Sequence, residues 1–148
     1  MATTERIFLH QGPISDRKIS ELLQQDLCSD VIGGQALFLG RVRADILEGK
    51  SVIGIEYSAY AEMVEAEFEK ILDHFLVLYP DLQQITMLHA VGMVPVGQTA
   101  LLVIVSGGHR KEAFKALPAI VDEIKSKVPV WKKEILGDGS ALWGANKE

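Results

Sequence analysis

The chain has 148 residues, of which 48% are apolar and 24% are charged, and its formal net charge at pH 7 is −5. This length predicts a single domain over residues 1–148, and the acidic excess argues against a general nucleic-acid binder. The single cysteine, Cys28, excludes an internal disulfide and a cysteine-rich metal site. No apolar run reaches the length of a membrane span, and the first residues do not resemble a signal peptide, so a cytoplasmic protein is expected.

Apolar periodicity predicts the elements in chain order. The expected elements are a strand at 6–10, a helix capped by Ser15, a strand at 35–43, a mobile loop at 44–50, a strand at 51–60, a helix at 61–78, strands at 84–91 and 99–105, and a helix at 111–127. The strands on either side of the loop are interpreted as neighbours, and the last two strands as an antiparallel pair. This irregular alternation, with hairpin-like pairs, predicts an α+β fold.

The last predicted helix carries an apolar stripe and a lysine at its border. Apolar residues recur at steps of three and four, at Phe114, Leu117, Val121, Ile124 and Val128. At about 100° per residue, Lys125 lies roughly 20° from Phe114 and borders this stripe. A partly desolvated ammonium is better suited to proton transfer than one on the outer face. Taken alone, Lys125 is more commonly interpreted as a solvated helix lysine.

Basic residues gather in one segment of this acidic chain. Gly107 and Gly108 separate a strand from a helix and allow close backbone approach to a ligand. His109 and Arg110 then open the helix, where free N–H groups and the helix dipole favour an anion. With the lysines downstream, this turn predicts a site for an anionic substrate, which Lys125 and Lys132 would face if the tail folds back. An ordinary helix opening is the alternative interpretation.

Several short segments match a known family in their order and spacing. They are Phe38-Leu39-Gly40-Arg41-Val42-Arg43, Glu56-Tyr57, His89 with Gly92, Ser106 with His109-Arg110-Lys111, Ala113-Phe114, Asp122 with Lys125, Pro129-Val130-Trp131-Lys132-Lys133-Glu134, and Trp143 with Asn146-Lys147-Glu148. On these segments the chain resembles the large, catalytic subunit of molybdopterin synthase, from about residue 35 to the C-terminus. Ala90 departs from this pattern, because relatives often carry arginine there, and the anion contact of that arginine would be missing or replaced.

The resemblance implies a sulfurtransferase. Its reaction moves sulfur from the C-terminal thiocarboxylate of a small ubiquitin-like subunit, which ends in Gly-Gly, to cyclic pyranopterin monophosphate, and forms the dithiolene of molybdopterin. The implied fold is an α/β hammerhead with a further antiparallel sheet and about three helices. Large subunits would pair as a homodimer within a heterotetramer. By position, Lys125 and Lys132 would be catalytic, Arg43, His109 and Arg110 would bind substrate, and no metal or cofactor is implied.

The residues themselves fit this chemistry and leave one alternative. Arginine and a helix N-terminus suit a phosphate, and desolvated lysines suit proton transfer. Cys28 is interpreted as a small buried hydrophobe, so a sulfur donor in trans is expected. The alternative is a non-catalytic α+β module that binds an anionic metabolite or a partner protein through the turn 107–110. The sequence does not decide which lysine is the acid–base or the order of the two sulfur transfers.

Overall fold

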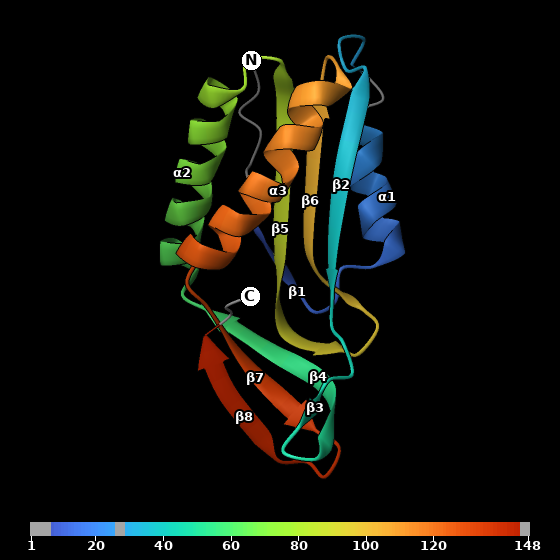
Figure 1. Cartoon of the computed structure of the whole chain (residues 1–148), viewed down its shortest axis with the longest axis vertical. Coiled ribbons are helices and arrows are strands. Elements are labelled where there is room, and N and C mark those ends of the chain that lie inside the picture. Colours follow the sequence, from blue (N-terminus) through green and yellow to red (C-terminus); the bar gives the residue numbers. More distant parts are fainter. Residues whose placement is uncertain (1–6, 26–28, 146–148) are drawn as a thin grey trace.

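The computed structural model describes residues 7–25 and 29–145. Its elements in chain order are β1 (Leu9–Gln11), α1 (Asp16–Gln24), β2 (Gly34–Arg41), β3 (Ile46–Leu47), β4 (Lys50–Ala59), α2 (Ala61–Leu78), β5 (Leu82–Pro95), β6 (Thr99–Gly107), α3 (Arg110–Lys127), β7 (Val130–Leu136) and β8 (Ala141–Ala145). Three helices and mostly antiparallel strands confirm the predicted α+β class. Figure 1 shows α2 and α3 beside the upper strands and the β4–β7–β8 layer below them.

Strand β5 joins the two parts of the sheet. The strand order is β2-β6-β5-β4-β7-β8, and β5 runs for 14 residues. Its first part, Leu82–His89, pairs with β6, and Gly92–Pro95 pairs with β4. At the start of the second ladder Gly92 adopts φ +90°, a conformation that costs a residue with a side chain far more than glycine. The strand therefore curves from the upper layer into the lower one, as Figure 1 shows.

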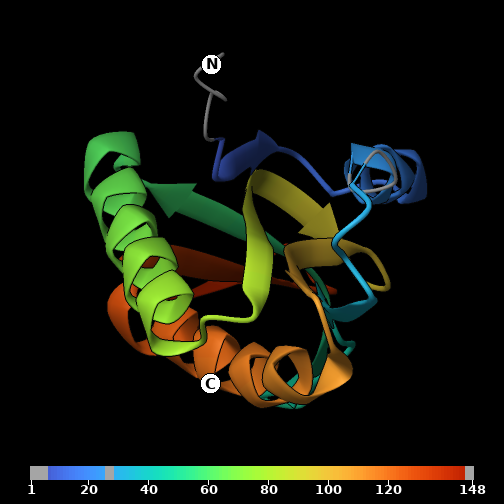
Figure 2. The same cartoon turned by 90° about the horizontal axis from the view of Figure 1, so that it is seen from above.

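Apolar side chains fill both faces of the upper layer. On the α2 and α3 side, Phe68 is fully buried and its ring stacks on that of Phe8 at 5.1 Å between centroids. On the other face, Ile19 of α1 packs with Leu102 and Ile104 of β6. In the view from above, α1 lies apart from α2 and α3 (Figure 2). The upper sheet is thus covered by apolar side chains on both faces.

The helices begin and end close to the predicted positions. The Ser15 hydroxyl accepts a hydrogen bond from the Lys18 N–H at 3.1 Å, which confirms the predicted cap of α1. Helix α2 covers the predicted 61–78, and α3 starts one residue before the predicted 111–127. Across residues 7–25 and 29–145, none of these helices has the length and apolarity needed to span a bilayer.

Two predictions about the region between β2 and β4 are wrong. These strands are not neighbours, because β2 pairs with β6 whereas β4 pairs with β5 and β7. The segment 44–50 is not a loop throughout, because β3 forms a short hairpin with β4. Its turn residues Glu48 and Gly49 both have positive φ, at 52° and 76°, as expected for a tight two-residue hairpin turn. After this turn β4 begins by running antiparallel to β3 and does not pair with β2.

The predicted apolar stripe of the last helix is displaced by about one residue. Phe114 is 63% exposed, and the buried face of α3 consists of Ala113, Ala116, Ile120 and Ile124. The small alanine side chains let the helix lie close to the sheet, where the larger phenylalanine ring would not fit, so Phe114 faces solvent. The C-terminal segment also contains more structure than expected, because β7 and β8 form an antiparallel hairpin.

Candidate functional site

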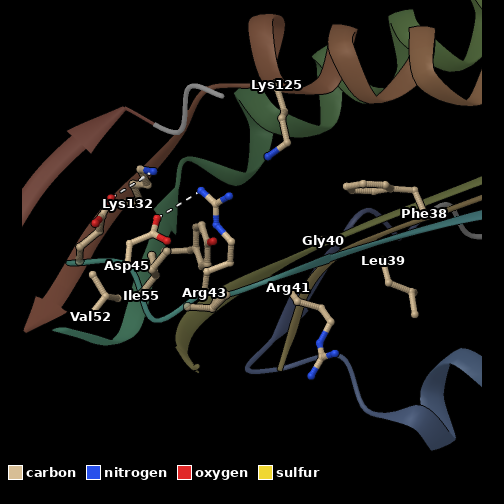
Figure 3. Close-up of a pocket in the computed structure, with 13 residues that line it drawn as sticks. Phe38, Leu39, Gly40, Arg41, Arg43, Asp45, Val52, Ile55, Lys125 and Lys132 are labelled. Atoms are coloured by element: carbon tan, nitrogen blue, oxygen red, sulfur yellow. Dashed lines mark hydrogen bonds and ion pairs between the residues drawn. The ribbon is translucent and has the colours of Figure 1, made fainter. Parts of the chain in front are cut away.

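A cavity of about 370 Å³ lies where the two layers meet. Its size is within the range of small-molecule sites. The end of β2, the following segment, β4, β7 and the last turn of α3 contribute its lining residues, which are Phe38, Leu39, Gly40, Arg41, Val42, Arg43, Asp45, Val52, Ile55, Tyr57, Lys125, Lys132 and Glu134. Figure 3 shows Lys125 extending from α3 towards Arg43, and Lys132 to the left of both residues.

The local fold explains why three predicted site residues meet here. Lys132 lies opposite Tyr57 in the β4–β7 ladder, and Glu134 lies opposite Ile55. Because side chains alternate along a strand, these four residues share the face that lines the cavity. Lys125 comes from the last turn of α3 and Arg43 from the segment after β2. The structure therefore brings Arg43, from the N-terminal half of the chain, together with Lys125 and Lys132.

Two ion pairs in the cavity differ in their exposure to solvent. Lys132 Nζ lies 3.1 Å from Glu134 Oε1, and the two side chains are 24% and 18% exposed. A pair this sheltered holds both groups in place, because either charge alone would be left partly desolvated. Arg43 Nη2 lies 3.2 Å from Asp45 Oδ2, but these side chains are 76% and 49% exposed. Such a screened pair is worth at most about 1 kcal/mol, so Arg43 can exchange Asp45 for an anionic ligand.

His89 is fully buried and uncharged. Its Nδ1 lies 2.8 Å from the carbonyl oxygen of Ala90. Because a carbonyl only accepts hydrogen bonds, Nδ1 carries the proton and Nε2 the lone pair. Burial lowers the pKa of His89 to about 4, with a further lowering from the Lys125 charge, while the bond to Ala90 opposes the change. The imidazole is therefore neutral at every pH at which the protein is expected to work.

Tyr57 packs against this histidine and lines the cavity. The two rings meet edge to face, with centroids 5.0 Å apart. Burial raises the pKa of Tyr57 to about 12, and the nearby Glu134 carboxylate adds to this effect. Sequence reasoning gave no role to Tyr57 or to Glu134, although both lie in segments that carried the family resemblance. The alternation of polar residues in β7, at Lys132 and Glu134, was the available signal.

The buried histidine predicts a specific loss of stability in acid. Below pH 6.5 the unfolded chain protonates His89, whereas the folded chain resists protonation until about pH 4. The free energy of unfolding should therefore fall by about 2–3 kcal/mol from this residue between those two pH values. Urea unfolding at pH 7 and pH 4.5 measures the fall, which His89→Phe should reduce. The exposed His74→Gln is the control, and an equal fall in His89→Phe would contradict the assignment.

His109 and Arg110 lie at the opposite end of α3 from the cavity. The helix has 18 residues, so its ends are about 27 Å apart at 1.5 Å per residue. The prediction that Lys125 and Lys132 face this turn within one chain is wrong, because the straight length of the helix separates them. His109 and Arg110 therefore do not line the cavity of their own chain.

A carboxylate of the protein itself occupies the start of α3. Asp81 Oδ2 accepts the His109 backbone N–H at 2.8 Å, and Oδ1 lies 3.2 Å from His109 Nδ1. A Cβ atom on Gly108 would meet Asp81 Oδ1 at 2.6 Å, so a side chain at this position would displace the carboxylate from its present place. Asp81 thus takes the place that the sequence assigned to a bound anion.

Removal of this cap should cost stability. Asp81→Ala is expected to lower the free energy of unfolding by about 1 kcal/mol, the usual effect of losing a side chain that caps a helix. Chemical denaturation of the variant measures the loss. Glu65→Ala, which removes an exposed carboxylate from α2, should change the value by much less. If the two variants were equally stable, Asp81 would not be the cap.

The chain matches a known protein family over most of its length. The model of the MoaE protein family matches residues 9–127. The chain belongs to the MoaE family. One member, the molybdopterin synthase catalytic subunit of Taeniopygia guttata, is 35% identical over 147 residues, which cover 99% of this chain and 91% of that protein. The molybdopterin synthase catalytic subunit of Rattus norvegicus is 37% identical over 135 residues, covering 91% of this chain and 64% of the rat protein.

A solved structure supports the same assignment. The crystal structure of molybdopterin synthase from Staphylococcus aureus superimposes with a TM-score of 0.82 at 28% identity, covering 96% of this chain and 98% of that one. Some MoaE relatives are much longer than this chain, which spans 38% of the Drosophila willistoni protein. Cys28, the residue predicted to be a buried hydrophobe, lies outside the described residues, and its role stays a prediction.

Proposed function

We propose that this MoaE family chain is the large, catalytic subunit of a molybdopterin synthase. It would transfer sulfur from the C-terminal thiocarboxylate of a small ubiquitin-like subunit to cyclic pyranopterin monophosphate and so form the dithiolene of molybdopterin. The observation that carries the proposal is the cavity in which Arg43, Lys125 and Lys132 converge. The relatives named as molybdopterin synthase catalytic subunits support the same reaction. A cytoplasmic location belongs to this proposal.

The cavity residues have different roles in the proposed reaction. Arg43 stands at the exposed rim, where a guanidinium pairs well with a phosphate in two parallel hydrogen bonds. Lys125 and Lys132 serve the proton transfers that accompany opening of the cyclic phosphate and arrival of sulfur. Glu134 fixes Lys132 through their 3.1 Å contact. The sulfur itself comes from the partner subunit.

His109 and Arg110 keep their proposed role in substrate binding through a second copy of the chain. Within one chain they lie a helix length away from the cavity. In a homodimer with twofold symmetry every contact is reciprocal, so a turn that lies at the partner's cavity implies that the partner's turn lies at the first chain's cavity. We therefore place the His109 and Arg110 of one chain at the cavity of its partner, within a heterotetramer with two small subunits.

The alternative of a non-catalytic anion-binding module receives less support. It depends on the turn 107–110 as the anion site. The Asp81 carboxylate already accepts the His109 N–H at 2.8 Å and brings negative charge to this turn. The cavity beside the two lysines is the better anion site of the chain.

Reconstitution tests the proposed reaction directly. The purified chain is mixed with cyclic pyranopterin monophosphate and a small carrier protein whose terminal Gly-Gly is a thiocarboxylate. Dithiolene formation is then assayed after oxidation to a fluorescent pterin. Product is expected with the thiocarboxylate and none with the same carrier bearing an ordinary carboxylate. A folded chain that binds the carrier and forms no dithiolene would reject catalysis and favour a binding module.

A further inference from the structure

Tyr57 is a buried polar side chain in the wall of the cavity that the proposed chemistry does not yet use. It is only 8% exposed and belongs to the lining residues together with Lys125 and Lys132. Within residues 7–25 and 29–145, its hydroxyl makes no hydrogen bond to another protein group. Buried tyrosine hydroxyls usually have a partner, because an unsatisfied one costs free energy. The unsatisfied donor therefore points to a ligand in the cavity.

The surroundings of Tyr57 define what it can offer. Its hydroxyl stays protonated because burial and the Glu134 carboxylate both oppose ionisation. It is therefore an uncharged donor at every working pH. The charged groups around it are Lys132 and Glu134 of β7, Lys125 of α3 and Arg43 of the segment after β2. Such a donor suits a single oxygen that carries partial negative charge.

The exposure of the lining residues distinguishes two kinds of ligand oxygen. Val52 and Ile55, which line the cavity on the same strand as Tyr57, are 3% and 9% exposed. A phosphate dianion needs several charged donors, and the exposed Arg43 at the rim is such a group. A glycine tail has no side chains and can approach buried lining residues closely, and its terminal acyl oxygen needs only one or two donors. The burial of Tyr57, in contrast to the exposed Arg43, therefore fits the end of the carrier tail.

The ring of His89 holds Tyr57 in this position. The histidine is 1% exposed, and its bond to Ala90 fixes its orientation. The edge-to-face contact at 5.0 Å then restricts the tyrosine ring. A neutral imidazole adds no positive charge beneath the two lysines, so it supports the tyrosine without competing for the anion.

We propose that the Tyr57 hydroxyl binds the terminal acyl oxygen of the carrier's C-terminal Gly-Gly, and that His89 is the positioning residue for its ring. This inference rests on the proposed function for the identity of the ligand. It adds a contact for the tail end that is separate from Arg43 and from the two lysines.

Peptide binding tests the contact without turnover. The probe is a synthetic ten-residue peptide that ends in Gly-Gly with a free carboxylate, in which an oxygen stands in for the thiocarboxylate sulfur. Its affinity for the full chain is measured by NMR titration and compared with that of the same peptide as a C-terminal amide. Tyr57→Phe should weaken carboxylate binding by about ten- to a hundredfold, as expected for a hydrogen bond to a charged group. The amide should lose much less.

Three further variants make the test specific. Tyr79→Phe removes the hydroxyl of a tyrosine that stacks on Phe75 away from the cavity, and it should bind like the wild type. His89→Phe keeps a ring against Tyr57 and should retain most of the preference for carboxylate, whereas His89→Ala should lose it.

The outcomes separate this inference from the reaction itself. A folded Tyr57→Phe chain that binds the carboxylate peptide as well as the wild type would overturn the inference, even if dithiolene formation is confirmed. A preference that depends on Tyr57 in a chain without sulfurtransferase activity would uphold the contact and reject the reaction.

Discussion

Lys125→Ala and Lys132→Ala should each lose most of the dithiolene turnover and still fold. General acid–base groups typically contribute about 10²–10⁴-fold to a rate, and both ammonium groups line the same cavity. The two losses should not multiply in the double variant if the lysines serve one step, because residues that act as a unit are not additive. Arginine replacements should rescue poorly, since a guanidinium keeps its charge but does not readily give up a proton. Single turnover with saturating thiocarboxylated carrier measures these effects.

Controls on the same helix separate catalysis from charge. Lys111→Ala and Lys115→Ala remove exposed lysines from α3 and should turn over like the wild type. Lys132→Ala also leaves Glu134 without its 3.1 Å partner, so a stability loss of about 1–3 kcal/mol is expected and must be measured alongside. If the cavity variants and the controls had equal rates, neither lysine would be catalytic.

Mixing two inactive variants should restore activity if sites are completed between chains. One chain carries Lys125→Ala and the other Arg110→Ala, and each homodimer is expected to be nearly inactive. In a mixed dimer one cavity combines an intact Lys125 with the partner's intact Arg110, and the other cavity has both defects. Random pairing makes about half of the dimers mixed, so about a quarter of the wild-type activity should return. Denaturing and refolding the two chains together, followed by the turnover assay, measures this gain.

One further mixture and one homodimer serve as controls for that experiment. Lys125→Ala with Lys132→Ala should give no gain, because both residues belong to the same chain's cavity. An Arg110→Ala homodimer with full activity would exclude the role of this arginine at any cavity. No gain from the first mixture, with Arg110→Ala inactive alone, would place its defect within its own chain.

Local patterns predicted the elements well and their partners poorly. Helix α2 is a long amphipathic repeat ended by Tyr79-Pro80, so its bounds follow from the sequence. The neighbours of β2 and β4 do not, because alternation shows which face of a strand is buried but not which strand lies beside it. The two-residue turn at Glu48 and Gly49 was the missing signal, and glutamate is an unusual residue for positive φ.

In the candidate site, too, some residues follow from the sequence and others only from the structure. Lys132 and Lys125 were found from a shared family spacing, and the cavity brings them together with Arg43. The turn at His109 was interpreted as a free anion site, but Asp81, 28 residues earlier, fills it. Tyr57 and His89 belong to the segments of the family resemblance, but the sequence assigns them no role, because burial and its effect on their pKa are recognised only in three dimensions.

The curvature of β5 affects the spacing between the amines of Lys125 and Lys132, the two residues proposed to be catalytic. Lys125 belongs to the helix that covers the upper layer, whereas Lys132 belongs to the lower layer, and β5 is hydrogen-bonded to β6 in one and to β4 in the other. A rotation of one layer against the other about Gly92 would therefore change the distance between Nζ atoms without altering any cavity residue. The geometry of the cavity thus depends on a backbone angle in a strand that contributes no side chain to the cavity lining.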